Sequence, residues 1–129
     1  MNKRERVMAA IRGEPVDRVP VAFWLHNFAQ EHSPAALADE TMRLYELFDW
    51  DFVKPQSRAT CFAEVFGTTI ARSAFRAVPF EITKYACANA HEFARLQPVD
   101  ATKGALGEQL EAFADLRRRL GPDVPIVGT

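Results

Sequence analysis

The sequence predicts an α/β fold that contains about three parallel strands. Three short runs, at residues 21–25, 51–54 and 124–127, have the composition of buried strands. Segments with helical periodicity separate these runs, and strands that alternate with helices indicate parallel βαβ units. A (β/α)8 barrel needs ~250 residues, so a chain of 129 residues is at most about half of one. We therefore expect residues 1–129 to be the amino-terminal part of an incomplete barrel domain.

The first expected helix begins after Asn2, which is a favourable N-cap residue, and ends at Gly13. A polar turn at residues 14–18 follows. The continuous apolar run Val21–Leu25 then predicts a strand that is buried on both faces, as in parallel sheets.

A second helix is predicted from Ser33, an N-cap residue that is followed by proline at the first helical position, to about Asp49. The run Asp51–Lys54 then predicts a second short strand, which Pro55 ends. The order of elements up to this point is helix, strand, helix, strand.

The segment 56–88 is too long for an ordinary connection between a strand and a helix, which makes it a candidate for function. Strand-forming residues at 68–70 and 80–85 predict a β-hairpin within it. Asn89 and Glu92 have the spacing of a capping box and predict a short helix after the hairpin.

A longer helix is predicted for residues 101–120, ended by Gly121 and Pro122. Its expected buried stripe consists of Leu106, Leu110, Phe113, Leu116 and Leu120. The last run, Val124–Val127, would be an exposed apolar edge strand if the domain were complete, and natural chains avoid such edges. This run supports the prediction of an incomplete domain.

Composition excludes several classes of protein. The net charge of −1 argues against a nucleic-acid partner, which would require a basic excess. Since no apolar run approaches the ~18 residues of a membrane span, and the charged amino terminus leads into no signal sequence, we expect no membrane partner and a cytoplasmic location. Cys61 and Cys87 are expected to be free thiols.

The opening of the chain resembles the uroporphyrinogen decarboxylase family. The resemblance is most specific in the run R-G-E-P-V-D-R-V-P-V at residues 12–21, which precedes the first barrel strand in that family. Residues 49–54, 101–110 and 120–126 resemble the family's second strand and its following helix and third strand. The resemblance implies a TIM (β/α)8 barrel whose active site lies at the carboxyl ends of the strands.

The chain departs from the decarboxylases of this family at the site itself. Those enzymes carry an Arg-Gln-Ala-Gly-Arg motif after the first strand, whereas residues 23–28 here are Phe-Trp-Leu-His-Asn-Phe. The family's aspartate after the second strand is not matched either, and Lys54 stands nearby. The chain is therefore more similar to divergent members, some of which are corrinoid-dependent methyltransferases with zinc ligands in later parts of the barrel.

The candidate site residues lie where the first two strands end. We predict His26 and Lys54 as catalytic residues and Arg58 and Trp24 as substrate-binding residues, because positive side chains at this edge suit a small anionic substrate. The sequence contains no H-x-x-x-H, H-E-x-x-H or C-x-x-C pattern, so no metal site and no cofactor are predicted within these residues.

Three functions remain open at the level of sequence. The first is a lyase that decarboxylates a carboxylate-bearing, tetrapyrrole-like substrate in porphyrin biosynthesis, as the family resemblance implies. The second is a corrinoid-dependent methyltransferase, for which zinc, a corrinoid and a corrinoid protein or a homodimer partner are implied in the full-length enzyme. The third is a truncated chain without activity of its own.

Overall fold

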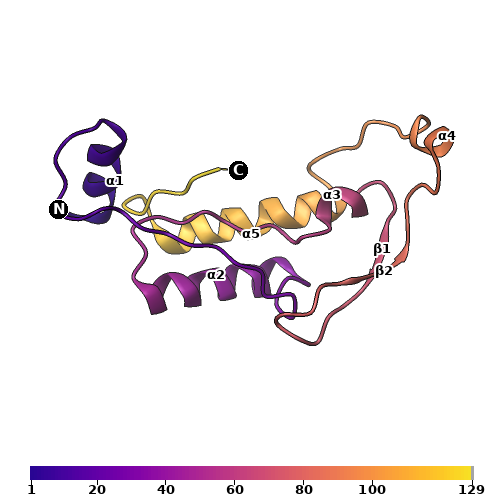
Figure 1. Ribbon diagram of the computed structural model, residues 1–129, viewed down its shortest axis with the longest axis horizontal. Coiled ribbons are helices and arrows are strands. Elements are labelled where there is room, and N and C mark those ends of the chain that lie inside the picture. The colour runs from indigo at the N-terminus through magenta and orange to yellow at the C-terminus, as the bar shows by residue number, and fades with distance from the viewer. Residues whose placement is uncertain (129) are drawn as a thin grey trace.

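The structure is a computed structural model, and it describes residues 1–128. Two long helices, α2 and α5, pack side by side, and the small hairpin and α4 lie at the far end of the molecule from α1 (Figure 1). No helix in the described residues is both long and apolar enough to cross a membrane. The elements are α1 (Lys3–Ile11), α2 (Pro34–Phe48), α3 (Cys61–Glu64), β1 (Thr69–Ala71), β2 (Glu81–Lys84), α4 (Ala90–Phe93) and α5 (Gly104–Leu120).

The helix starts confirm the N-caps that the sequence predicts. The side chain of Asn2 accepts a hydrogen bond from the backbone N–H of Glu5, whose carboxylate accepts one in return, so that α1 opens with a capping box. Ser33 caps α2 by accepting from the N–H of Ala36 at 3.2 Å. These contacts satisfy backbone donors that have no partner within their own helix.

Helix α5 begins at Gly104, three residues later than predicted. The carboxylate of Asp100 accepts hydrogen bonds from both the backbone and the hydroxyl of Thr102, which holds the preceding residues in a turn. The predicted stripe is only partly correct: Leu116 is fully buried, but Leu110 is 50% exposed and Ala112 is buried in its place. The direction from which α2 approaches decides which face is covered.

The hydrophobic core lies between the two long helices and the segments 51–54 and 124–127. Its buried members are Ala38 of α2, Leu116 and Leu120 of α5, and the two segment residues Val53 and Val124. Val53 is fully buried, so the centre of the core is on the second predicted strand.

The prediction of three parallel strands requires correction, because the only strands among residues 1–128 are β1 and β2. Segment 51–54 instead makes one isolated parallel bridge, between Val53 and Ile126. The N–H of Val53 donates to the carbonyl of Pro125, and the N–H of Val127 donates to the carbonyl of Val53, both at 2.9 Å. The direction and adjacency of these two segments are as expected, but the ladder is too short to form a strand.

The first predicted strand, segment 21–25, has a single backbone hydrogen bond to its neighbour, in which the N–H of Asp51 donates to Val21 at 2.9 Å. The N–H of Val21 donates to the Asp51 carboxylate rather than to a backbone carbonyl. Further along, Phe23 and Trp24 are 65% and 48% exposed. Parallel strands need both faces covered, and this segment lacks that cover within the described residues. A barrel is therefore not seen in this part of the chain.

The predicted hairpin is confirmed. Strands β1 and β2 are antiparallel, with Ile70 opposite Ile82 and a register irregularity next to Thr69. The hydroxyls of Thr69 and Thr83 are 2.8 Å apart and form a cross-strand hydrogen bond.

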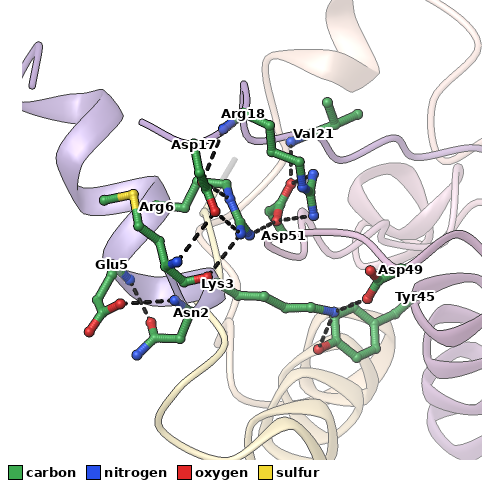
Figure 2. A network of polar contacts seen from close by, with 11 residues as sticks. Asn2, Lys3, Glu5, Arg6, Asp17, Arg18, Val21, Tyr45, Asp49 and Asp51 are labelled. Atoms are coloured by element: carbon green, nitrogen blue, oxygen red, sulfur yellow. Dashed lines mark hydrogen bonds and ion pairs between the residues drawn. The ribbon is translucent and has the colours of Figure 1, made fainter. Parts of the chain in front are cut away.

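A partly buried ionic cluster joins α1 to the starts of segments 21–25 and 51–54 (Figure 2). We call it the arginine network, and it consists of Arg6, Asp17, Arg18 and Asp51. The Asp51 carboxylate is fully buried and accepts from Arg6 at 2.6 Å, from Arg18 at 2.6 and 2.8 Å, and from the N–H of Val21 at 2.8 Å. Arg6 also makes a two-pronged contact with Asp17, at 2.6 and 2.8 Å.

The arginine network has a clear electrostatic consequence. Hydrogen bonds from Arg6 hold the pKa of the Asp17 carboxyl well below its usual range, although partial burial opposes this. Asp17 and Arg18 belong to the run at residues 12–21 that carries the family resemblance. The structure thus provides a physical reason for those residue types: they anchor the first segment to α1 and to the start of the second segment.

Candidate functional site

Three of the four predicted site residues meet where segments 21–25 and 51–54 end. The ring of His26 is stacked on Phe28, with centroids 5.0 Å apart, and contacts Trp24 edge-on at 6.0 Å. The ammonium group of Lys54 lies over the Trp24 ring, 4.5 Å from its centroid, in a cation–π contact. We call these residues, together with Gln56, the histidine cluster. The structure therefore brings His26, Lys54 and Trp24 together.

Both ring nitrogens of His26 have partners. Nδ1 lies 2.7 Å from Oε1 of Glu31, and Nε2 lies 3.0 Å from the amide nitrogen of Gln56. The side chain of His26 keeps 25% of its surface exposed, whereas Glu31 is almost fully buried. A cleft of only about 10 Å³ between the two segments is lined by Trp24, Lys54 and Gln56, which is at most enough for one water molecule.

Lys54 differs from most cations of this chain because no carboxylate within residues 1–128 forms an ion pair with it. Among the described residues, its ammonium group lies against the face of the Trp24 ring. A half-buried ammonium group that has no acidic partner among the described residues is a suitable place for a small anion.

Arg58 is placed differently from the other three predicted residues. Its guanidinium is 6% exposed and donates to Glu64 at 2.8 and 2.9 Å and to Glu108 at 2.7 Å. These contacts join α3 to α5. The guanidinium is thus directed at carboxylates of the protein rather than at the histidine cluster, and its substrate-binding role stays a prediction.

A large apolar pocket lies away from the histidine cluster. It has a volume of about 710 Å³ and is enclosed by α3, the end of the hairpin and α4, with Phe62, Phe66, Tyr85 and Phe93 among its lining. No charged side chain lines it. Because chemistry on an anionic substrate requires polar groups, we place the candidate site at the histidine cluster instead.

Two residues of the site were missed by the sequence analysis, namely Glu31 and Gln56. Glu31 stands five residues after His26 in a run of turns, and that spacing corresponds to no helix or strand period. Gln56 follows Pro55 at the start of the long loop, where nothing in the sequence singles it out. Only the folding of the turn onto segment 51–54 brings these side chains together.

The part of the chain that the structure describes brings together no group of three His, Cys, Asp or Glu side chains that could hold a metal ion. Cys61 lies in α3, where burial raises the pKa of its thiol and disfavours a thiolate. The residues present therefore do not form the zinc site that the methyltransferase resemblance implies.

Comparison with known proteins identifies the family of the chain. The family model described as "Uroporphyrinogen decarboxylase (URO-D)" matches residues 2–129. A match over nearly the whole chain shows that the chain belongs to the URO-D family.

The similar curated proteins are methyltransferases. The methylcobamide:CoM methyltransferase MtbA of Methanosarcina acetivorans is 25% identical over a 142-residue alignment, and that of Methanosarcina mazei is 24% identical; each alignment covers 98% of this chain and 41% of the relative. A solved methyltransferase structure from Methanosarcina mazei superposes with a TM-score of 0.67 at 25% identity, over 99% of this chain and 42% of that one. The chain thus spans about two fifths of the length of the relatives it matches.

Proposed function

We propose that this chain is the amino-terminal part of a methyltransferase that transfers a methyl group from a methylated corrinoid to a small anionic thiol. The observation that carries the proposal is the similarity to methylcobamide:CoM methyltransferases over 98% of the chain, with a matching solved methyltransferase structure. This similarity favours the methyltransferase alternative over the decarboxylase that the sequence analysis placed first. The family itself accommodates both.

The composition of the histidine cluster supports the same choice. Residues 23–28 lack the arginines with which decarboxylases of this family hold several carboxylates, and Lys54 supplies a single positive group in their place. One ammonium group and one imidazole suit a ligand with a single anionic group. In the proposed reaction, Lys54 binds the anionic group of the acceptor, His26 supports Trp24 through its edge-on contact, and Trp24 excludes water from one side of the ammonium group.

Zinc is not part of the proposed role of this chain. The described residues do not form a zinc site, and no step is assigned here to the metal. The corrinoid enters only as the methyl donor, and a corrinoid protein that carries it is the partner that the proposal implies. A homodimer and a cytoplasmic location stay predictions.

The test is a direct comparison of the two reactions with the full-length protein. We expect methylcobalamin and 2-mercaptoethanesulfonate to yield the methyl thioether. The reaction is measured by the change in corrin absorbance and by the loss of free thiol. In parallel, uroporphyrinogen is supplied and release of CO2 is measured. Decarboxylation without methyl transfer would contradict the proposal and favour the lyase, and absence of both reactions with intact protein would contradict both.

A further inference from the structure

Glu31 is a buried carboxylate whose position calls for an explanation. Its side chain is only 2% exposed and lies in the turn between His26 and the N-cap residue of α2. Burying an ionised carboxylate costs free energy unless hydrogen bonds replace its water. Both of its oxygens have such partners: Oε1 contacts Nδ1 of His26 at 2.7 Å, and Oε2 accepts from the N–H of Ala59 at 3.1 Å.

These partners assign the proton on His26. An ionised carboxylate only accepts hydrogen bonds, so Nδ1 must be the donor in the contact with Glu31. In the neutral ring, Nε2 is then the acceptor, which matches the amide group of Gln56 at 3.0 Å. Glu31 therefore fixes both the tautomer and the orientation of the imidazole.

The orientation of His26 is passed on to the rest of the histidine cluster. The ring packs flat on Phe28, with an interplanar angle of 7°, and its edge meets Trp24 at 87°. The Trp24 ring in turn lies beneath the ammonium group of Lys54. A carboxylate that holds His26 thus sets the position of the aromatic surface on which Lys54 rests.

The other end of Glu31 is attached to a rigid part of the fold. Ala59 follows Arg58, whose side chain is held by Glu64 of α3 and Glu108 of α5. The carbonyl of Glu31 also lies 3.4 Å from the Arg58 guanidinium. Glu31 consequently joins the histidine cluster to a point that two helices hold in place, as a precise site requires.

Only a carboxylate can accept a hydrogen bond from both partners of Glu31. The two partners of Glu31, the Nδ1–H of His26 and the N–H of Ala59, are both donors. A glutamine at this position has one acceptor oxygen and one NH2 group, so it can accept from only one of them. If its NH2 group faces Nδ1, the proton of His26 must move to Nε2, where it meets the amide of Gln56.

We infer that Glu31 is the positioning residue of the histidine cluster: it holds His26 in the Nδ1–H tautomer and thereby places Trp24 and Lys54 for a small anionic ligand. The identity of that ligand as a thiol rests on the proposed function. The tautomer of His26 does not, because it follows from the hydrogen bonds alone.

The experiment uses the full-length protein with 15N-labelled histidine, and the His26 resonances are assigned by their loss in His26→Gln. Spectra at about pH 8.5, above the ordinary titration range of histidine, report which ring nitrogen carries the proton. We expect a protonated Nδ1 in the wild type and a changed tautomer in Glu31→Gln. Loss of this positioning should also raise the Kd for 2-mercaptoethanesulfonate about tenfold, as one hydrogen bond to a charged group would.

The matched control is Glu40→Gln. Glu40 is also a shielded glutamate near the site, but it contacts Asn27 and Arg43 and not His26, so both the spectrum and the Kd should stay as in the wild type. Melting curves establish that each variant is folded.

Several results would overturn the inference. A proton on Nε2 of His26 in the wild type would do so even if Glu31→Gln fails to fold. An unchanged spectrum in a folded Glu31→Gln protein would also overturn the inference. A changed tautomer with an unchanged Kd would show that the orientation of His26 does not affect ligand binding. If the wild type shows the Nδ1–H tautomer but does not bind the thiol, the proposed function fails while the positioning of His26 by Glu31 stands.

Discussion

The arginine network and the histidine cluster lie at opposite ends of the same two segments, yet their charges are arranged in opposite ways. In the arginine network, every guanidinium faces a carboxylate, and Asp51 is fully buried among its donors. In the histidine cluster, Lys54 faces an aromatic ring, and Trp24 is about half exposed. The comparison distinguishes two uses of charge. Charged side chains that are paired with an opposite charge of the protein fix the two segments to α1, whereas a charged side chain without such a partner is available to a ligand.

The same difference between the two ends of a segment is expected along each strand of a (β/α)8 barrel. Residues at the amino ends of the strands stabilise the fold, and residues at the carboxyl ends form the active site. Asp51 starts its segment and Lys54 ends it, only three positions later. Three substitutions test whether the two ends are as different as this arrangement implies.

The largest effect is expected for Asp51→Ala. The substitution removes one of the two carboxylate partners of the buried Arg6 guanidinium and leaves the N–H of Val21 without its acceptor. Breaking a buried ion pair on one side costs about 3–5 kcal/mol in the free energy of unfolding, which denaturant titration measures. Asp39→Ala removes an exposed partner of Arg119 and serves as the control, with a loss of about 0–1 kcal/mol. Equal losses in the two variants would show that the arginine network does not stabilise the fold.

An intermediate effect, on ligand binding rather than on stability, is expected for Lys54→Ala. Removing the ammonium group over Trp24 should reduce turnover or binding of an anionic ligand by roughly ten- to a hundred-fold, equivalent to about 1.5–3 kcal/mol. Steady-state kinetics or calorimetry measures the loss. Lys84→Ala on the exposed face of β2 is the control and should bind as the wild type does. Full activity in Lys54→Ala would remove Lys54 from the site.

The smallest effect concerns the pH dependence that Asp17 contributes. Arg6 lowers the pKa of Asp17 in the folded protein below its value in the unfolded chain, so the contribution of Asp17 to stability is complete well above the unfolded pKa. It decreases as the pH falls below about 4, towards the folded pKa. The difference in melting temperature between wild type and Asp17→Asn should therefore shrink between about pH 6 and pH 3. A difference that is constant over this range would mean that the Arg6–Asp17 contact does not perturb the carboxyl in solution.

Short-range features of the fold were predicted from the sequence with good accuracy. The N-caps Asn2, Ser33 and Asn89 all open helices, because capping depends on a side chain and on backbone donors two or three residues away. The hairpin of β1 and β2 was found for a similar reason, since its pairing partners are close in sequence. Family membership was also recognised correctly, from the run at residues 12–21.

The errors concern contacts between distant residues. The predicted parallel strands depend on neighbours far away in the chain, and within the described residues only Val53 and Ile126 form a parallel bridge. The buried face of α5 depends on where α2 packs, which is why Leu110 was misplaced. Arg58 is a separate case: its guanidinium is paired with Glu64 and Glu108, and its substrate-binding role stays a prediction.

What the sequence determined by itself is therefore the family, the N-caps of three helices, the hairpin, and the choice of His26, Lys54 and Trp24 as neighbours at one edge. These follow from local hydrogen bonding and from the rule that parallel segments end at a common edge. Only the tertiary structure decided that Glu31 is buried against His26 and that the charge of Arg58 is neutralised while that of Lys54 is not. The reason is physical: whether a polar side chain is buried or paired depends on which distant segments surround it, and sequence spacing does not contain that information.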